Sequence, residues 1–71
     1  MSDKYVRITD CEVFEDSESG KAFRCGINGN LVWVPYSQCR ARHINKKVHG
    51  DDTIEVTAWW AEKNDLDGEV V

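Results

Sequence analysis

Residues 31–39 read LVWVPYSQC, with two valines around a tryptophan and then the only proline of the chain. Residues 22–27, AFRCGI, have the apolar and β-branched content of a second strand. Between the two segments lies the pair Asn28-Gly29, which is among the strongest short signals for a β-hairpin. The sequence therefore predicts a tight hairpin over residues 22–35.

The end of this stretch predicts how the hairpin stops. Pro35 has no N–H to donate to a neighbouring strand, so the strand should end there or lie at an edge. Ser37 is well placed to cap a single helical turn. Trp33 belongs to the strand with the strongest β pattern, and tryptophan is highly buried on average. We therefore expect Trp33 to lie in the core.

A further strand precedes the hairpin. Residues 4–14, KYVRITDCEVF, alternate apolar and polar side chains, but the apolar positions change from even to odd near Asp10. A shift of one residue would turn every later side chain to the other face of the sheet. A β-bulge at Thr9 or Asp10 absorbs such a shift and curls the strand, as a small barrel requires.

The chain after the hairpin predicts three further features. Residues 40–48 are basic and weakly patterned, and they form either a fourth, polar strand or a long loop. Ile54 and Val56 share one face of a last strand. Residues 58–64, AWWAEKN, contain good helix formers and predict a short helix. The acid-rich end, residues 65–71, is expected to fray.

These elements predict one domain over residues 1–71. Four or five short strands with tight turns indicate an all-β fold with one short C-terminal helix. The expected architecture is a small, strongly bent antiparallel sheet or partial barrel, SH3-like or OB-like.

Length and composition restrict the possible activities. A chain of 71 residues with 41% hydrophobic residues has a small core, with too little volume for a deep catalytic cleft. No G-x-S-x-G, P-loop or H-E-x-x-H motif occurs, so we expect neither an enzyme nor a cofactor. No apolar run is long enough to span a membrane and the polar start is unlike a signal peptide, so we expect a cytoplasmic protein.

The cysteines predict free thiols. Their number is odd, and none of them forms a close C-x₂₋₄-C pair. A zinc site from Cys39 and His43, with His49 and Cys11 or Cys25, is a weak alternative because zinc sites usually contain such pairs. We expect no bound metal, and each cysteine is expected to act as a small apolar residue.

Charge is distributed in three blocks. Residues 1–18 carry a net charge of −4, residues 19–50 contain six bases and no acid, and residues 51–71 carry a net charge of −6. Such blocks can steer charged partners toward the protein. They can equally pair with one another across the sheet. The sequence leaves both interpretations open.

The basic block suggests nucleic-acid binding as one function. Four bases are candidate phosphate contacts: Arg40, Arg42, Lys46 and Lys47. Trp33, Tyr36 or Phe23 could stack on the bases of a single strand, as aromatic residues do on OB-type platforms. The overall charge of −4 and the pI near 5.0 oppose binding to a polyanion.

Protein binding is the function that composition favours. Tryptophan, tyrosine and arginine are enriched at the centres of protein interfaces. Adjacent residues point in different directions on any helix or strand, so Trp59 and Trp60 cannot both lie deep in one small core. We expect Trp59 in the core and Trp60 on the surface. The predicted protein-binding residues are Glu15, Asp16, Glu18, Asp51, Asp52, Tyr36 and Trp60.

Three segments carry a resemblance to a known group of proteins. KAFRC, VWVPYSQC and IEVTAWWAEKN, spread over about residues 20–64, resemble small phage and prophage-encoded proteins. The most specific part is Val32 to Gln38, although Tyr36 stands where a lysine is common and the basic insert at 40–49 is longer. The resemblance implies a phage accessory protein with a small β-barrel fold and no catalytic residues. It also implies that Trp33 and Pro35 serve the fold and that Ser37 and Gln38 cap the turn.

We therefore expect a small, non-enzymatic phage accessory protein that binds a host or defence protein stoichiometrically. The acid-rich segments 10–18 and 51–55 could imitate a phosphate backbone and block a nucleic-acid-binding surface. The alternative is a module that binds single-stranded nucleic acid through the basic stretch 40–47. The sequence does not predict the oligomeric state.

Overall fold

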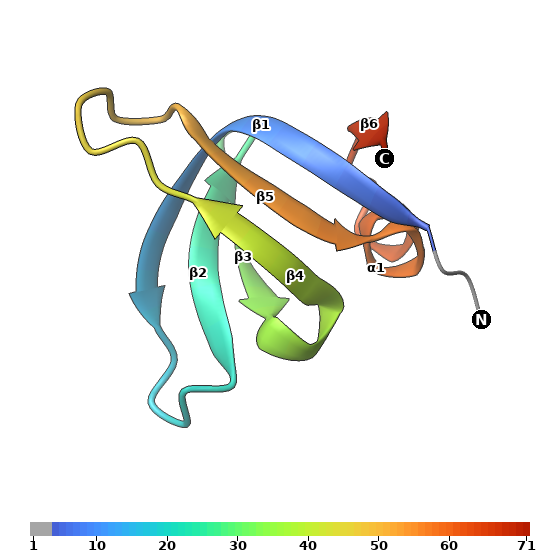
Figure 1. Cartoon of the computed structure of the whole chain (residues 1–71). Helices are drawn as coiled ribbons and strands as arrows, with labels where there is room; N and C mark the ends of the chain where they lie inside the picture. Colours follow the sequence, from blue (N-terminus) through green and yellow to red (C-terminus); the bar gives the residue numbers. More distant parts are fainter. Residues whose placement is uncertain (1–3) are drawn as a thin grey trace.

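The longest strand, β1 (Tyr5–Asp16), stands in the middle of the sheet in the computed structural model, which describes residues 4–71. The strand order is β3-β2-β1-β5-β4, and neighbouring strands are antiparallel. β5 (Asp52–Thr57) pairs with the first half of β1, and β2 (Ala22–Ile27) pairs with its second half. Figure 1 shows β1 arching over the other strands. The sheet is strongly bent but not closed, and the predicted all-β class is confirmed.

Two irregularities bend β1. The pairing with β5 shifts between Ile8 and Cys11, where Asp10 takes a positive φ of 54°. The pairing with β2 shifts between Val13 and Asp16. An extra residue in one strand of a pair increases the local twist and bends that strand. The first irregularity confirms the predicted bulge, and the second was not predicted.

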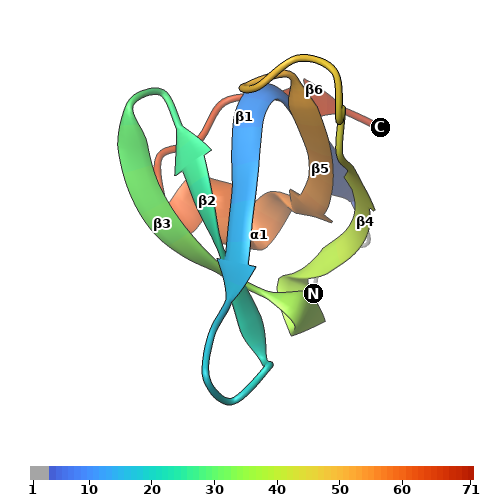
Figure 2. The ribbon, with the colours of Figure 1, turned by 90° about the vertical axis from the view of Figure 1, so that its left-hand side faces the viewer.

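The predicted hairpin consists of β2 and β3 (Asn30–Pro35). Asn28 and Gly29 join the strands with φ values of 52° and 81°. Positive φ at both central residues is typical of the type I′ turn, whose twist matches that of the flanking strands. The hairpin prediction is therefore confirmed (Figure 2).

The strand ends at Pro35 as predicted, and a 3₁₀ turn, η1 (Tyr36–Gln38), follows. The prediction that Ser37 caps this turn is wrong, because Pro35 occupies the capping position and no side chain bonds there. Gln38 has the structural role instead. Its Oε1 accepts a hydrogen bond of 2.6 Å from Thr57 Oγ1, which ties η1 to the end of β5.

The basic segment after η1 was predicted to be either a polar strand or a long loop, and it contains one of each. β4 (Cys39–His43) pairs with β5, and a loop follows it. On β5, Ile54 and Val56 are fully buried, as their alternation predicts. The predicted helix is α1 (Ala58–Lys63). Among residues 4–71 there is no helix with the length and apolar character needed to span a membrane.

Residues 65–71, which were predicted to fray, are packed against the rest of the fold in the structure. Leu66 N–H bonds to the Ala61 carbonyl at 2.9 Å, while Asp65 takes a φ of 53°. This return of the chain is typical of a Schellman helix end. β6 (Glu69–Val70) then pairs with the first half of β1, opposite the edge that β5 occupies.

Gly68 explains why this tail can dock on β1. A Cβ added there would lie 2.4 Å from Val6 Cγ1 and 2.5 Å from the Arg7 carbonyl oxygen. Only a residue without a side chain allows the backbone to approach so closely. The acidic composition of the segment suggested disorder and concealed this packing role.

The buried core lies on the inner side of the bent sheet. Its largest fully buried side chains are Phe23, Ile54, Val34, Val56, Cys11 and Cys25. Trp33 is not among them, because Phe23 and Cys25 pair with Val34 and Val32 and thereby turn Trp33 outward. The prediction that Trp33 is buried is wrong: 47% of its surface is exposed.

The two adjacent tryptophans have the opposite roles to those predicted. Trp60 is 6% exposed and belongs to the core, whereas Trp59 is 53% exposed. Thr57 sets this arrangement, because its Oγ1 accepts a hydrogen bond from Trp60 N–H and fixes where the helix begins. With that start, Trp60 and Ala61 face the sheet. Trp60 is therefore not a surface residue for a partner.

Candidate interaction surface

The outward side of β1, β2 and β3 carries three large apolar side chains at the surface. Phe14, Leu31 and Trp33 are all at least 40% exposed. Leu31 pairs with Gly26 and Trp33 with Arg24, which places these residues on one face of the sheet. Acidic residues lie beside the apolar ones, with Glu12 near Phe14 and Leu31, and Glu15 and Glu18 near Trp33. We call this surface the acidic–aromatic face, and its members are Glu12, Phe14, Glu15, Glu18, Leu31 and Trp33.

Arg24 positions the tryptophan of this face. The guanidinium carbon of Arg24 lies 4.7 Å from the centroid of the Trp33 ring, and Arg24 Nε lies 3.3 Å from Glu15 Oε1. A guanidinium over an indole is attracted by the negative face of the ring. The contact orients Trp33 while leaving about half of the side chain open to a partner.

A shallow hollow opens between Trp33 and the turn that follows β1. Its lining consists of Trp33, Arg24 and the run from Glu15 to Ser19. Three of the predicted protein-binding acids, Glu15, Asp16 and Glu18, therefore line one hollow with Trp33, although the Asp16 carboxylate is bonded to the Tyr36 hydroxyl. An acidic hollow with an aromatic wall is suited to a cationic side chain.

Gly26 allows the other two apolar residues of the face to meet. A Cβ at Gly26 would lie 3.3 Å from Phe14 Cε2 and 3.8 Å from Leu31 Cδ2, so both side chains pass over this glycine. Glu12 and Asp10 border the same region. The face thus joins an apolar ridge to an acidic margin.

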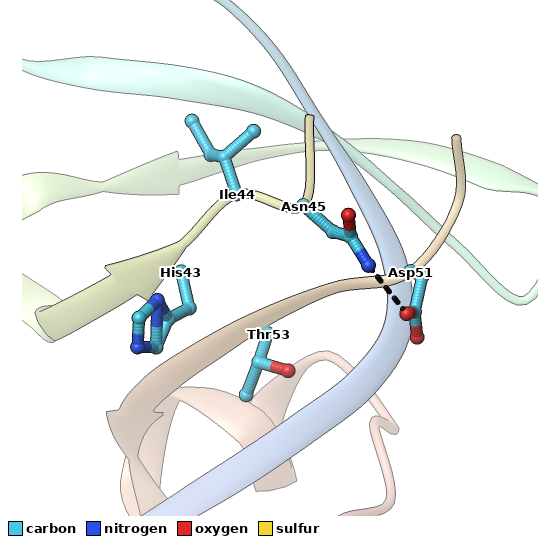
Figure 3. A pocket seen from close by; sticks show the side chains of 5 residues that line it. All are labelled: His43, Ile44, Asn45, Asp51 and Thr53. Atoms are coloured by element: carbon cyan, nitrogen blue, oxygen red, sulfur yellow. Dashed lines mark hydrogen bonds between the residues drawn. The ribbon is translucent and has the colours of Figure 1, made fainter. Parts of the chain in front are cut away.

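Asp51 lies apart from this face, in the loop between β4 and β5. Figure 3 shows it in a small hollow lined also by His43, Ile44 and Thr53, where Asn45 Nδ2 donates a hydrogen bond of 2.8 Å to its carboxylate. The loop and the turn after β1 lie at different ends of the molecule (Figure 1). The structure does not join Asp51 to the acids around Trp33.

Asp52 is a structural residue, and its predicted role in partner binding is wrong. It is 3% exposed. Its Oδ2 accepts a hydrogen bond of 2.8 Å from Val13 N–H, and its Oδ1 accepts one of 2.8 Å from Asn45 N–H. The carboxylate therefore connects β1 to the loop before β5 and has no surface to offer a partner.

Tyr36 is held by contacts within the chain. Its ring lies 5.1 Å from that of Phe23, and its hydroxyl donates a hydrogen bond to the Asp16 carboxylate. This bond, which the neutral tyrosine donates, raises the pKa of Tyr36. Tyr36 joins η1 to the end of β1, so its hydroxyl and the Asp16 oxygen are already partnered.

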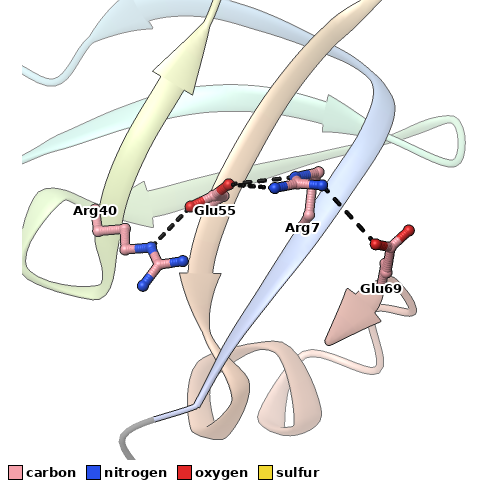
Figure 4. Close-up of polar contacts among 4 residues, drawn as sticks. All are labelled: Arg7, Arg40, Glu55 and Glu69. Carbon is pink, nitrogen blue, oxygen red and sulfur yellow. Dashed lines mark hydrogen bonds and ion pairs between the residues drawn. The ribbon is translucent and has the colours of Figure 1, made fainter. Parts of the chain in front are cut away.

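Arg40, a candidate phosphate contact, also has partners within the chain. Its Nε lies 2.7 Å from Glu55 Oε1, and its guanidinium stacks 4.2 Å above the Tyr5 ring. Arg7 holds the other oxygen of Glu55 at 3.1 Å and reaches Glu69 on β6 (Figure 4). The hydrogen bonds from Arg40 and Arg7 lower the pKa of Glu55.

The remaining basic candidates are divided between a strand and a loop. Arg42 on β4 lies over the rings of Phe23 and Tyr36, at 4.9 and 5.2 Å from their centroids. Lys46 and Lys47 are exposed in the loop. Phe23 is fully buried, so this predicted stacking residue cannot contact a base.

The three cysteines are free thiols, and Cys11 and Cys25 are buried. Cys11 Sγ donates to the Asp52 carbonyl at 3.3 Å. A hydrogen bond with Cys11 and burial both raise the pKa of Cys25, which keeps that thiol neutral. Within residues 4–71, no three His, Cys, Asp or Glu side chains are grouped so as to hold a metal ion.

Phe14 and Leu31 of the acidic–aromatic face were missed from the sequence, and Trp33 was named only as a possible stacking residue for nucleic acid. The alternation of β3 contained the signal, because Val32 and Val34 occupy one face and Leu31 and Trp33 the other. Average burial suggested that the tryptophan lies inside. The register instead places Val34 and Val32 opposite the buried Phe23 and Cys25, so the valines face the core and Trp33 faces outward.

Comparisons of the chain with protein-family models, with curated proteins and with solved structures find no match.

Proposed function

We propose that this protein is a non-catalytic, stoichiometric binding module that contacts a basic surface of a partner protein through the acidic–aromatic face. The observation that carries this proposal is the position of Trp33, half exposed in the wall of a hollow lined by Glu15, Asp16 and Glu18. Trp33 lies outside the buried core, so we expect the fold to tolerate its replacement.

Aromatic and acidic residues have complementary parts in this proposal. Trp33, Phe14 and Leu31 supply apolar area that a partner can bury, as the anchors of protein interfaces do. The carboxylates attract a basic partner and orient its approach, which raises the association rate more than the final affinity. The net charge of −4 supports the same preference for a basic partner.

The resemblance of residues 32–38 to phage-encoded proteins supports a biological setting for this activity. In that setting the partner is a host or defence protein, and its basic surface is one that binds nucleic acid. The row of carboxylates from Glu12 to Glu18 would then occupy the place of backbone phosphates. The cytoplasm of the host cell is the expected compartment.

Direct binding of single-stranded nucleic acid is less well supported. Arg40 is already paired with Glu55, and the four candidate bases are divided between β4 and the following loop. Trp33, the exposed aromatic residue on β3, lies beside carboxylates that would repel a phosphate backbone.

Two matched variants test the proposed face. The first, Trp33→Ala with Glu15→Gln and Glu18→Gln, removes the tryptophan and two charges. The second, Trp59→Ala with Glu62→Gln and Asp67→Asn, removes the same chemistry elsewhere, because Trp59 is 53% exposed and lies against Lys63. Each protein is immobilised and exposed to a lysate of infected host cells.

We expect the wild type and the second variant to retain one basic protein and the first variant to lose it. The retained protein is then purified and titrated by calorimetry, where we expect a ratio of 1:1 and an affinity that falls with salt. Duplex DNA should compete with the module for the retained protein. Retention by the first variant and loss by the second would place the interface elsewhere and overturn the proposal.

A further inference from the structure

β3 lies at one end of the sheet, and its outer edge pairs with no strand in residues 4–71. Such an edge presents unpaired N–H and C=O groups, which can template another strand. Which residues present these groups follows from the hydrogen bonding of the hairpin.

Leu31 and Trp33 are the residues whose backbone groups point away from β2. Tyr36 N–H bonds to the Lys21 carbonyl at 2.9 Å, and the two-residue turn is closed by the pair of Ile27 and Asn30. Hydrogen-bonded and non-hydrogen-bonded pairs alternate along an antiparallel ladder. Even-numbered residues of this strand therefore bond to β2, and odd-numbered ones face the open edge. Pro35 also faces outward, so its missing N–H costs the hairpin nothing.

The two edges of the sheet differ in how they are protected. Natural proteins commonly block an edge strand with charged side chains or proline. β4, at the other end, carries Arg40 and Arg42. No charged residue lies between Ile27 and Cys39, so Pro35, at the end of β3, is the only such device on that strand.

We propose that β3 pairs antiparallel with β3 of a second copy of this chain, forming a two-fold symmetric dimer. β3 carries no charged residue, so pairing it with a second β3 brings no like charges together along the strands. A basic segment would find no acidic side chain on β3 with which to pair. Leu31 pairs with Trp33 of the second copy and Val32 with its own counterpart. Each of the two Leu31–Trp33 pairs then forms two backbone hydrogen bonds, which gives four between the copies.

This register suits the side chains and the proline. Directly opposite residues point to the same face, so each Leu31 side chain packs beside the Trp33 ring of the other copy. If one strand slid by two residues, Pro35 of one copy would lie opposite Leu31 of the other. Proline has no N–H, so this pair would lose one of its two backbone hydrogen bonds. The acidic–aromatic faces of the two copies become continuous, with Leu31 and Trp33 meeting at the seam.

The size of the contact predicts a weak dimer. Pairing along one six-residue strand buries less than the about 1,200–2,000 Å² of a standard interface. We therefore expect association on the order of 10–100 µM, visible as a concentration-dependent mass in sedimentation equilibrium.

Hydrogen exchange on the wild-type protein tests the register. Between about 10 µM and 1 mM, a range set by the expected weak association, the amides of Leu31 and Trp33 should become protected. Those of Val32 and Val34, which already bond to β2, should not change. A mass that remains monomeric at the highest concentration would overturn the proposal. So would concentration-dependent protection confined to β4, which would indicate a different edge.

Variants separate the backbone contact from the side-chain contact. Leu31→Pro removes an outward N–H without touching the ladder to β2, so we expect a folded monomer. Leu31→Ala keeps the N–H and should weaken dimerisation about tenfold through lost apolar area, about 1.4 kcal/mol. Ile44→Ala, at a loop residue of similar exposure, is the control and should dimerise like the wild type. A dimer that persists in folded Leu31→Pro contradicts pairing through β3.

Discussion

At the scale of single residues, the three tryptophans show how backbone direction decides the use of a side chain. Trp59 and Trp60 are adjacent, but the hydrogen bond between Thr57 and Trp60 turns only the second toward the core. Trp33 has strong β neighbours and still points outward, because the register of the hairpin turns it away from the core. Residue type alone predicted none of these three placements.

Replacement of each tryptophan should therefore have different effects on stability. We expect Trp60→Ala to lower the free energy of unfolding by about 3–5 kcal/mol, because it leaves a large cavity. Trp33→Ala should cost within about 1 kcal/mol, as surface substitutions usually do. Urea unfolding followed by circular dichroism measures both. A Trp33→Ala protein that fails to fold would show that this side chain supports the fold after all.

Asp52 gives a second contrast between neighbouring residues. Asp52→Ala leaves the N–H groups of Val13 and Asn45 without their charged acceptor, and we expect a loss of about 2–4 kcal/mol. Asp51→Ala, at the exposed neighbour, serves as the control and should cost about 0.5 kcal/mol or less. Equal effects in thermal unfolding would show that the buried carboxylate has no special role.

Glu55 makes stability depend on pH. Arg40 and Arg7 lower its pKa below the ordinary value of 4.5. Its contribution to stability is therefore complete above pH 4.5 and disappears as the pH falls through the lowered value of the folded protein. We expect Glu55→Gln to be less stable than the wild type at pH 7 and the difference to shrink at pH 3. A difference that grows in acid would contradict this account.

At the scale of elements, local patterns predicted most of the fold. The change of alternation near Asp10 located the bulge, Asn28-Gly29 located the hairpin, and Ile54 with Val56 located the last strand. These signals are local and depend on only a few neighbouring residues. Docking of the tail depends on contacts between distant segments, which no local pattern records. The alternation of β3 recorded which of its side chains share a face, but which of the two faces is buried depends on the register with β2.

Gly68 permits one of these distant contacts, and its replacement should release the tail. An alanine Cβ would overlap Val6 and the backbone of Arg7, so we expect Gly68→Ala to detach β6 from β1. The Val71 amide, which bonds to the Tyr5 carbonyl, should then exchange rapidly with solvent. Asp67→Ala is the matched control and should leave that amide protected. Unchanged protection in Gly68→Ala would mean that the backbone can shift to accept a side chain.

At the scale of the whole molecule, the structure shows the charge blocks pairing in part with one another. Bases of the middle block pair across the sheet with acids of the two ends, as Arg24 does with Glu15 and Arg40 with Glu55. Other acids, including Glu12 and Glu18, gather on the outer side of β1–β3. Pairing thus uses part of the charge, and the surface retains an acidic region.

This distribution predicts how the protein responds to nucleic acid. We expect no binding to labelled single-stranded or duplex oligonucleotides at physiological salt, because the net charge of −4 repels a polyanion. Fluorescence anisotropy at two salt concentrations measures this. Micromolar binding that weakens with salt and is lost when Arg42, Lys46 and Lys47 are reversed would favour the nucleic-acid alternative.

The central place of β1 has a consequence for the order of folding. The first half of β1 pairs with β5, which comes late in the chain. Arg7 and Glu55, which meet across these two strands, are 48 residues apart. During synthesis, β1, β2 and β3 are complete before β5, so a meander formed from these three strands would leave its apolar inner side uncovered. Contacts between such distant segments slow folding. We therefore expect the nascent chain to be most prone to aggregation and proteolysis until β5 emerges and pairs with β1.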